Sequence, residues 1–534
     1  MLYGFYYLKK RPEILHHVLV SVLVLLLGYS TFFVLVIRSQ ANTPMDENNP
    51  ENAISLLSYL NREQYGDWPI LYGQYYNAKN PVEYKDGTPV YGRDTLQKKY
   101  VIIDDRKASI PVYDKAYCTY FPRMWSQQGG HANFYESWSG FNPDESDSPV
   151  PSFKQNLNYF FKYQVGYMYL RYFGWNFIGR QNDVQGLNNN CTEGNVISGI
   201  KAIDKKMNGV DPDKMPYALK KNKGTNTFYF LPLILGLIGL LFHAYAHPKD
   251  FIVCLLLFFF TGLAIVIYLN QYPYQPRERD YAYAASFYAF AIWIGLGVIG
   301  IIESMNKLIQ QQNAKDQKGK TGISKIDKLA LVEGNPYAFI VSEGGTSAAN
   351  QSFSLGISAL TFVLTLFVPY IMASQGWDDH DRSKRTMSRD FAINYLQSCD
   401  KNAVLFTNGD NDTFPLWYAQ EVEGIRTDVR VINLSLLQTD WYINQMRRAA
   451  YDSPPVPFTM APEKYEGSKR EVVYIVPDKK FSGFQTAKRM IDFVASDDEN
   501  DKIFNGDRYY DYLDRKSTRL NSSHTDIFRM PSSA

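Results

Sequence analysis

The chain has 534 residues, of which 45% are hydrophobic and 21% are charged, and its formal net charge is +2. So small a charge provides no basic surface field, and we exclude a nucleic-acid partner. The four cysteines show neither the CxxC nor the Cys/His spacings that hold structural zinc. The distribution of hydrophobic residues is more informative, because they gather in runs long enough to cross a membrane.

Five apolar runs predict five transmembrane helices, because a span needs about 20 apolar residues. They lie at about residues 14–37, 228–245, 251–269, 283–302 and 353–373. The first run follows Lys9, Lys10 and Arg11 and has no small-residue cleavage site after it. It is therefore expected to remain as a membrane anchor, in domain 1–37, and not to be removed as a signal peptide. The next three spans form domain 228–302.

A further apolar segment lies at residues 160–178, but it contains Lys162 and Arg171. Each of these charges would cost roughly 2.5 to 3.5 kcal/mol near the centre of a span. We therefore predict an interfacial amphipathic helix here.

The distribution of lysine predicts which loops face the cytoplasm. If Lys9, Lys10 and Arg11 are cytoplasmic, five spans return the loop 303–352 to the cytoplasm, and residues 307–328 of that loop hold six lysines and no arginine. The loop region 38–227, the turn 270–280 and everything after the span 353–373 are then exported, meaning that they face away from the cytoplasm. We expect the chemistry in these exported segments.

The loop 38–227 contains Cys118 and Cys191, which would form a disulfide or remain two free thiols. The chain also has 41 Tyr, 33 Phe and 8 Trp, many of them outside the apolar runs. Such rings stack on sugar faces or lie at a lipid interface, although core packing explains most of them.

The turn at residues 271–281, QYPYQPRERDY, places two arginines at the exported end of a predicted span. The guanidinium groups of Arg277 and Arg279 suit a phosphate or pyrophosphate group, which in a lipid-linked donor would lie at this depth. The alternative is a salt-bridged cluster of these arginines with Glu278 and Asp280.

The sequence WDDHD at residues 377–381 follows the last span and brings Asp378, Asp379 and Asp381 close together in the chain. These carboxylates could hold a divalent cation. A solvated cap just outside the membrane explains the same residues equally well.

The exported region 374–514 is predicted to be an α/β domain. Helices at 390–397, 413–422 and 439–448 alternate with strands at 403–409, which looks buried, and 429–437, a pattern typical of a βαβ unit. Ligands of such domains bind beyond the carboxyl ends of the strands, where Asp410 and Asp412 lie. Because Asp just before or inside the first turn is an ordinary helix cap, we favour capping over ligand or metal binding for both.

Several runs carry a family resemblance that covers most of residues 1 to about 510. They closely resemble the domain-of-unknown-function 2723 family of bacterial membrane proteins, which is similar to the eukaryotic transmembrane protein O-mannosyltransferases. The runs include FFKYQVGYMYLRYFGWNFIGRQND, NQYPYQPRERDYAYAASFYAF, GWDDHDRS and LFTNGDNDTFPLWYAQEVEGIRTDVRVINLSLLQTDWYI.

The resemblance implies a glycosyltransferase-C enzyme of the bacterial inner membrane, with the large loop and the C-terminal domain in the periplasm. Such an enzyme passes a sugar such as mannose from a polyprenyl-phosphate donor to a protein or surface-glycan acceptor. Arg277 and Arg279 would bind the donor phosphate, with Tyr272, Tyr274 and Tyr281 near the glycan or the lipid.

The resemblance also implies that this chain is the C-terminal part of a longer enzyme. The family's catalytic acid lies in an early exported loop that no residue here matches, so the catalytic base is expected upstream and the chain alone is expected to be inactive. Residues 515–534 resemble translated sequencing-adaptor sequence, and we set them aside as an artefactual tail.

A second class of function fits the same topology. The chain could be a non-enzymatic envelope protein whose exported domain binds a glycan or a partner protein. A transporter is less favoured, because the five apolar runs carry no charged residue of the kind that marks an ion pathway.

The predicted topology determines which introduced cysteines react from outside the cell. In a cysteine-free background, a cysteine near Lys318 should be protected from a membrane-impermeant maleimide in intact cells. A cysteine near Asp410 should react, because it lies on the exported side. Reaction of both from one side would contradict the five-span topology.

Overall fold

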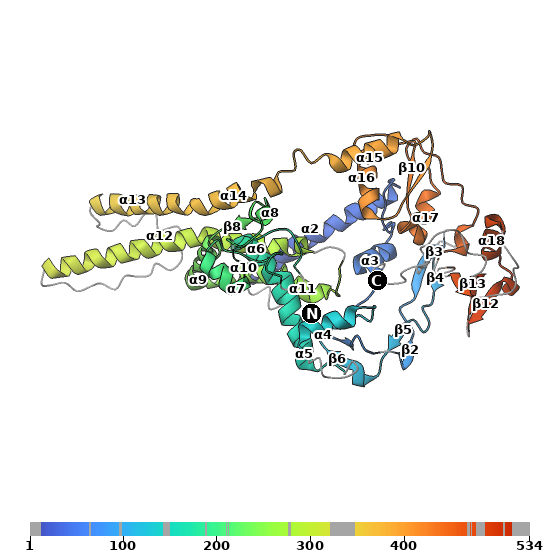
Figure 1. Cartoon of the computed structure of the whole chain (residues 1–534), viewed down its shortest axis with the longest axis horizontal. Helices are drawn as coiled ribbons and strands as arrows, with labels where there is room; N and C mark the ends of the chain where they lie inside the picture. The colour runs from blue at the N-terminus through green and yellow to red at the C-terminus, as the bar shows by residue number, and fades with distance from the viewer. Residues whose placement is uncertain are drawn as a thin grey trace. The chain divides into compact units, whose positions relative to one another are not determined.

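The structure is a computed structural model of the chain (Figure 1). It describes residues 12–514 except 64–65, 79, 95–98, 142–149, 187–189, 210, 212, 276–278, 321–347, 467–469, 471–472, 477–485 and 506–507. The chain divides into two compact units, which we describe separately. The α/β unit comprises Met1–Asp67, Val82–Val112 and Arg385–Ala534, and the helical unit comprises Trp68–Pro81 and Tyr113–Lys384. Residues 38–227, expected as one loop domain, are thus shared between the units, and the tail 515–534 lies outside the described residues.

The helical unit contains these elements in chain order: β1 (Tyr72–Gln74), η2 (Lys115–Tyr117), β6 (Cys118–Tyr120), α4 (His131–Ser139), α5 (Phe153–Tyr159), η3 (Phe160–Leu170), α6 (Arg171–Phe177), β7 (Gly179–Arg180), α7 (Lys201–Asn208), α8 (Tyr217–Lys220), β8 (Asn226–Thr227), α9 (Leu231–Ala246), α10 (Pro248–Phe260), α11 (Leu263–Leu269), η4 (Asp280–Tyr283), α12 (Ala284–Lys320), α13 (Ala348–Thr365) and α14 (Phe367–His380).

The α/β unit contains α2 (Pro12–Gln40), α3 (Ala53–Asn61), β2 (Glu83–Lys85), β3 (Val90–Asp94), β4 (Lys99–Asp104), β5 (Ile110–Val112), α15 (Met387–Gln397), β9 (Val404–Thr407), α16 (Asp410–Glu421), β10 (Arg430–Asn433), η6 (Leu436–Gln438), α17 (Asp440–Met446), η7 (Pro462–Lys464), β11 (Val473–Val476), α18 (Ala487–Val494), η8 (Glu499–Asp501), β12 (Lys502–Asn505) and β13 (Arg508–Asp514).

Four helices in the described part of the chain are long and apolar enough to cross a membrane: Glu13–Gln40, Pro248–Leu269, Asp280–Leu308 and Ser354–His380. They overlap four of the five predicted spans. The run at 228–245 forms α9, which has 16 residues and is therefore about 24 Å long, against a hydrocarbon core of about 30 Å. The expected loop 303–352 begins as helix, since α12 continues to Lys320.

Glycines allow α9 to pack closely against α12. A Cβ atom on Gly239 would lie 1.8 Å from the backbone oxygen of Trp293, and one on Gly297 would lie 2.1 Å from the backbone oxygen of Leu235. Small residues of this kind let apolar helices approach backbone to backbone. Trp293 is fully buried at this contact.

Helices α12 and α13 extend side by side (Figure 1) and are joined by a polar contact. The Asn306 side-chain amide donates to the Ser358 hydroxyl at 3.3 Å, and the Ser354 hydroxyl donates to the Asn306 side-chain oxygen at 2.7 Å. Side-chain hydrogen bonds between apolar helices fix their register, because an unpaired amide would cost free energy there.

The segment 160–178, predicted as an interfacial helix, is absent from the four candidate spans and is helical throughout its first 18 residues. It runs through the π-helix η3 into α6. Tyr169 and Phe177 are buried, Tyr169 against α11 and η4 and Phe177 against α12, while Lys162 is exposed. The segment is thus packed against the candidate spans on one side, with Lys162 in contact with solvent and Arg171 partly buried.

The βαβ unit predicted for the C-terminal region is confirmed. Strands β9 and β10 are parallel, with Val404 opposite Arg430, and α16 connects them. Helices α15 and α17 also coincide with the predicted helices within a few residues. The prediction that the first strand is buried is wrong, because Val404 and Phe406 are 45% and 58% exposed in a sheet of only two strands. Further along the chain, β11, β13 and β12 form a mixed three-stranded sheet.

All four cysteines are free thiols in this structure, so Cys118 and Cys191 do not form the disulfide that the sequence left open.

The close approach of α9 and α12 predicts how glycine substitutions act on stability. Gly239→Ala should lower the melting temperature of the detergent-solubilised protein, because the added methyl group forces two backbones apart at a cost of about 1 to 3 kcal/mol. Gly295→Ala, on the same α12 but with no atom within 4 Å of the added Cβ, is the matched control. The control should keep or slightly raise the melting temperature, because alanine favours helix over glycine. Equal effects would show that α9 and α12 are not packed in this way.

Candidate functional site

The described part of the helical unit contains a pocket whose empty space is about 640 Å³, including the part open to solvent. The part of this space available to the centre of a water-sized molecule is about 160 Å³. The wall is rich in aromatic hydroxyls, with five tyrosines: Tyr163, Tyr167, Tyr172, Tyr274 and Tyr283. Its polar and charged members are Arg171, Arg279, Gln185, Gln271 and Gln275. No carboxylate is among the residues that line it.

One wall comes from a single helical face. Tyr163, Tyr167 and Arg171 follow one another at intervals of four residues through η3 into α6, so they lie on one side of the helix. The rings of Tyr163 and Tyr167 are stacked, with centroids 5.5 Å apart. Trp138 packs against both rings, at 5.1 and 5.4 Å. The wall is therefore rigid, because each ring is held by its neighbours.

Arg171 holds a positive charge in this wall. Its guanidinium carbon lies 4.0 Å from the ring centroid of Tyr167, 4.8 Å from that of Tyr172 and 4.7 Å from that of Trp175. Its Nε donates to the backbone oxygen of Tyr167 at 3.1 Å. Cation–π contacts of this kind stabilise a partly desolvated cation. The sequence analysis weighed Arg171 only as an obstacle to a span, although its spacing from Tyr163 and Tyr167 was a signal for a shared face.

A second part of the wall is the turn between α11 and η4, and Asn270 anchors its start. Asn270 is fully buried, and its side-chain amide donates to the backbone oxygens of Pro69 at 2.8 Å and Pro122 at 2.9 Å. Its side-chain oxygen accepts from Gln164 at 3.2 Å. Its backbone oxygen accepts from the indole nitrogen of Trp125 at 3.0 Å. The turn is thereby tied to three distant segments of the chain.

The C-terminal carbonyl groups of α11 are also satisfied by side chains. The Arg123 guanidinium donates to the backbone oxygen of Ile267 at 2.9 Å, and the Trp68 indole donates to that of Tyr268 at 2.8 Å. These carbonyls would otherwise lack partners at the helix end, where a cation is also favoured by the helix dipole. Burial lowers the pKa of Arg123 to about 10, so it remains charged at neutral pH.

The structure places the residues predicted for a phosphate site as follows. Arg279 and Tyr274 line the pocket. Tyr272 instead stacks on His131, with ring centroids 5.5 Å apart, and Tyr281 is exposed. Arg277 lies outside the described residues.

The salt-bridged alternative is tested only in part. Among the described residues no ion pair joins Arg279 to Asp280. Glu278, like Arg277, lies outside the described part of the chain.

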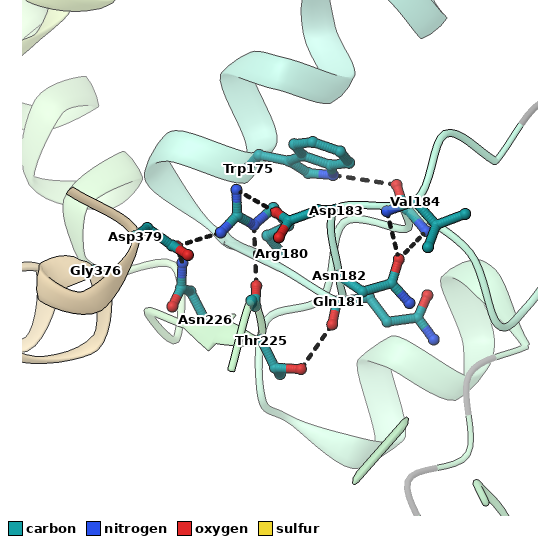
Figure 2. Close-up of polar contacts among 12 residues, drawn as sticks. Trp175, Arg180, Gln181, Asn182, Asp183, Val184, Thr225, Asn226, Gly376 and Asp379 are labelled. Atoms are coloured by element: carbon teal, nitrogen blue, oxygen red, sulfur yellow. Dashed lines mark hydrogen bonds and ion pairs between the residues drawn. The ribbon is translucent and has the colours of Figure 1, made fainter. Parts of the chain in front are cut away.

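Asp379, predicted as a metal or ligand residue, instead makes a structural ion pair (Figure 2). It pairs with Arg180 of β7, which also contacts Asp183 at 2.9 Å and donates to the backbone oxygen of Gly224 at 3.0 Å. The Trp175 ring lies between Arg171 and Arg180, whose guanidinium carbon is 5.6 Å from its centroid. The pair thus connects α14 to the loop that follows the pocket wall.

The other two carboxylates of that segment do not join Asp379 in a cation site. Asp381 accepts a hydrogen bond from the backbone nitrogen of Ser383 at 3.0 Å, as a local turn does, and Asp378 is exposed. Within the described residues no group of three His, Cys, Asp or Glu side chains converges to hold a metal ion. The solvated cap that the sequence offered as the alternative agrees with the exposure of Asp378 and the local hydrogen bond of Asp381.

The aspartates at the start of α16 behave as cap residues. The Asp412 carboxylate accepts from the backbone nitrogens of Asn408 at 2.8 Å and Gly409 at 3.0 Å. These bonds lower the pKa of Asp412 below its usual value, and the bond from Asn408 has the largest effect. The capping role favoured from the sequence is confirmed for Asp412, while Asp410 is exposed at the first position of the helix.

Two family models match parts of the chain. Residues 388–530 match TMEM260-associated domain 2, and residues 66–161 match a family of unknown function, DUF8416. The similarity is regional. The first match covers the βαβ unit and extends into the tail 515–534, which the sequence analysis had set aside. The second covers Trp125, His131 and Trp138 and ends at the start of η3. Neither model is the domain-of-unknown-function 2723 family expected from the sequence.

The remaining comparisons add no relative, because no curated protein and no solved structure matches the chain.

The ion pair of Asp379 predicts a difference between two carboxylates that share one arginine. Asp379→Asn should destabilise the protein by about 1 to 3 kcal/mol, because Arg180 would keep a partly buried charge without its main partner. Asp183→Asn is the control, since the Asp183 side chain is 65% exposed and such pairs contribute about 0 to 1 kcal/mol. Unfolding by denaturant would measure both. A larger loss for Asp183→Asn would contradict the structural role of Asp379.

Proposed function

We propose that this chain is part of a membrane glycosyltransferase that takes a sugar from a polyprenyl-phosphate donor. The observation that carries this proposal is the pocket that gathers Arg171 and Arg279 among tyrosine rings, at the ends of two candidate membrane spans. In this proposal five helices cross the bacterial inner membrane, α9 as the shortest, and the pocket faces the periplasm.

The two guanidinium groups supply the chemistry for a phosphodiester. Arginine presents several N–H donors in a planar fork that matches phosphate oxygens, and it stays charged at every physiological pH. Arg171 is fixed by aromatic rings, and Arg279 extends from the turn before η4. The two cations come from different segments, so a phosphate bound between them would hold the turn against the helical wall.

The position of the pocket favours a lipid carrier over a soluble phosphate. One of its walls includes the turn between α11 and η4, and these two elements belong to the candidate spans Pro248–Leu269 and Asp280–Leu308. A polyprenyl chain would lie along the exposed apolar side chains of these helices, which include Tyr268 and Tyr288. The phosphate at its head would then reach the arginines at the membrane surface.

The tyrosine rings provide the apolar surface that a sugar ring needs. Aromatic rings pack against the C–H faces of sugars, and their hydroxyl groups remain available for hydrogen bonds. Tyr274 is 56% exposed at this pocket, whereas Tyr163 is buried behind it.

One of the two family matches is consistent with the same class of enzyme. The similarity to a TMEM260-associated domain is consistent with an O-mannosyltransferase-like protein. It agrees with the resemblance drawn from the sequence, which makes mannose the first sugar to test and a protein or surface glycan the acceptor. In this proposal the pocket binds and orients the donor, and no described residue is assigned as the general base.

A second candidate is glycan binding by the C-terminal domain without catalysis. Aromatic side chains are exposed on α15 and α16, with Phe391 at 56%, Tyr395 at 47% and Phe414 at 49%. Binding of a soluble glycan that depends on these rings, together with no affinity for polyprenyl phosphate, would favour this candidate.

The proposal predicts that Arg279 recognises phosphate through its fork and not through charge alone. Arg279→Lys should weaken binding of polyprenyl phosphate by about tenfold or more, because lysine keeps the charge but loses the paired donors. Affinity would be measured with the full chain in lipid nanodiscs. Arg382→Lys, an exposed arginine after α14, is the matched control and should not change the affinity. Equal affinities for wild type and Arg279→Lys would refute the assignment of Arg279.

A further inference from the structure

Gln271 is a buried side chain of the pocket whose hydrogen-bonding groups are unused. Its side chain lines the pocket and the residue is only 6% exposed. Neither its amide nitrogen nor its amide oxygen forms a hydrogen bond with any of the described residues. Asn270, one residue earlier and equally buried, has partners for both kinds of group.

This arrangement costs free energy in the protein itself. A buried amide that lacks partners loses its hydration without replacement, at roughly 1 to 3 kcal/mol per group, and native structures contain few such groups. Gln275, on the same wall, also has an amide oxygen without a partner among the described residues. Two amide oxygens and one amide nitrogen without a partner among the described residues thus belong to two residues that line the same pocket.

The chemistry of these groups restricts what would satisfy them. An ionised phosphate only accepts hydrogen bonds, so it could pair with the Gln271 nitrogen but not with the Gln271 or Gln275 oxygens. A hydroxyl group both donates and accepts, and neighbouring hydroxyls on a sugar ring can serve the two ends of one amide. The arginines provide positive charge for the phosphate. The glutamine amides provide the hydrogen-bond donor and acceptors that the hydroxyl groups of a sugar ring need.

We propose that Gln271 is a specificity-determining residue that binds hydroxyl groups of the sugar in a phosphorylated, lipid-linked donor. This inference rests on the proposed function, and it adds the part of the site that distinguishes a glycosylated carrier from the bare phosphate. Arg171 and Arg279 contact the phosphate, and the Gln271 amide contacts the sugar beside the tyrosine rings.

Gln271 is held in place before any ligand binds. The preceding Asn270 is fixed by its contacts to Pro69, Pro122 and Gln164, and the Gln164 amide also reaches the backbone oxygen of Gln271 at 3.5 Å. Groups fixed in this way lose little freedom on binding, so their hydrogen bonds favour the ligand more fully.

The test compares donors with and without a sugar. The full chain in nanodiscs would be titrated with polyprenyl-phosphate-mannose, with polyprenyl phosphate and with GDP-mannose, a soluble molecule that carries the same phosphate and hydroxyl chemistry. The variant Gln271→Met keeps the length of the side chain and removes both hydrogen-bonding groups. Gln397→Met, an exposed glutamine at the end of α15, is the matched control.

Gln271→Met should weaken binding of the mannosylated lipid by about tenfold, the effect of losing one or two hydrogen bonds, and leave binding of polyprenyl phosphate within about twofold. The control should change neither affinity. An unchanged affinity for the mannosylated lipid, or an equal loss for both lipids, would overturn the role of Gln271 while leaving the proposed function in place. Binding of neither lipid to the wild type would instead refute the proposed function. If GDP-mannose binds to the wild type while neither lipid does, and Gln271→Met weakens the binding of GDP-mannose, then Gln271 recognises the sugar of a soluble donor.

The melting temperature of the ligand-free protein tests whether Gln271→Met acts only by destabilising the fold. Because the amide has no partner among the described residues, Gln271→Met should leave the melting temperature of the ligand-free protein unchanged or raise it. A fall of several degrees would mean that Gln271 supports the fold, and it would overturn the inference. If the Gln271→Met variant fails to fold, the lipid affinities and the melting temperature would be measured with Gln271→Leu, which also removes both hydrogen-bonding groups.

Discussion

The buried amide of Asn270 is the constraint on which the candidate site depends. One side chain there uses both donors and its acceptor to join the end of α11 to Pro69, Pro122 and Gln164. A fully buried amide must find such partners, since leaving them unmade costs more than the hydrogen bonds contribute on average. The left-handed backbone of Asn270, with φ of 38°, also suits asparagine at a helix end. Once this residue is placed, the turn that carries Gln271, Tyr274 and Arg279 has little freedom.

The aromatic residues of the loop regions give the pocket its rigid wall. The many tyrosines in the sequence suggested stacking on sugars, contact with lipid or packing in the core. In the structure some of these rings are packed in the core and others are exposed at the pocket. Tyr163 is buried against Phe134 and Trp138, whereas Tyr274, whose ring lies 5.0 Å from Phe134, remains half exposed. The same cluster therefore stabilises the fold with its inner rings and leaves an outer ring exposed at the pocket.

Carboxylates that lie close together in the sequence were considered as ligand or metal residues, and in the structure they make structural contacts. Asp379 and Asp412 stood out because acidic residues were close together in the chain, yet one pairs with Arg180 and the other caps α16. In contrast, the polar groups that face the pocket were inconspicuous in the sequence. Arg171 looked like a charge to be tolerated, and Gln271 is an uncharged residue in a turn. What distinguishes them is their burial and, for the Gln271 amide, the absence of a partner among the described residues, which are properties of the folded chain.

The sequence by itself determined the elements whose signals are local. Apolar runs of about 20 residues marked four helices of candidate span length. The alternation of strand and helix patterns predicted β9, α16 and β10 to within a few residues of their observed bounds. Two of the residues selected from the sequence, Arg279 and Tyr274, line the candidate pocket, and their role as a phosphate site remains a prediction. Only the tertiary structure decided that η3 and α6 pack beside that turn, because this depends on contacts between residues more than 100 positions apart, such as Gln164 with Asn270. Hydrophobic periodicity reports which face of an element is buried, but it carries no information about which distant side chain satisfies a buried polar group.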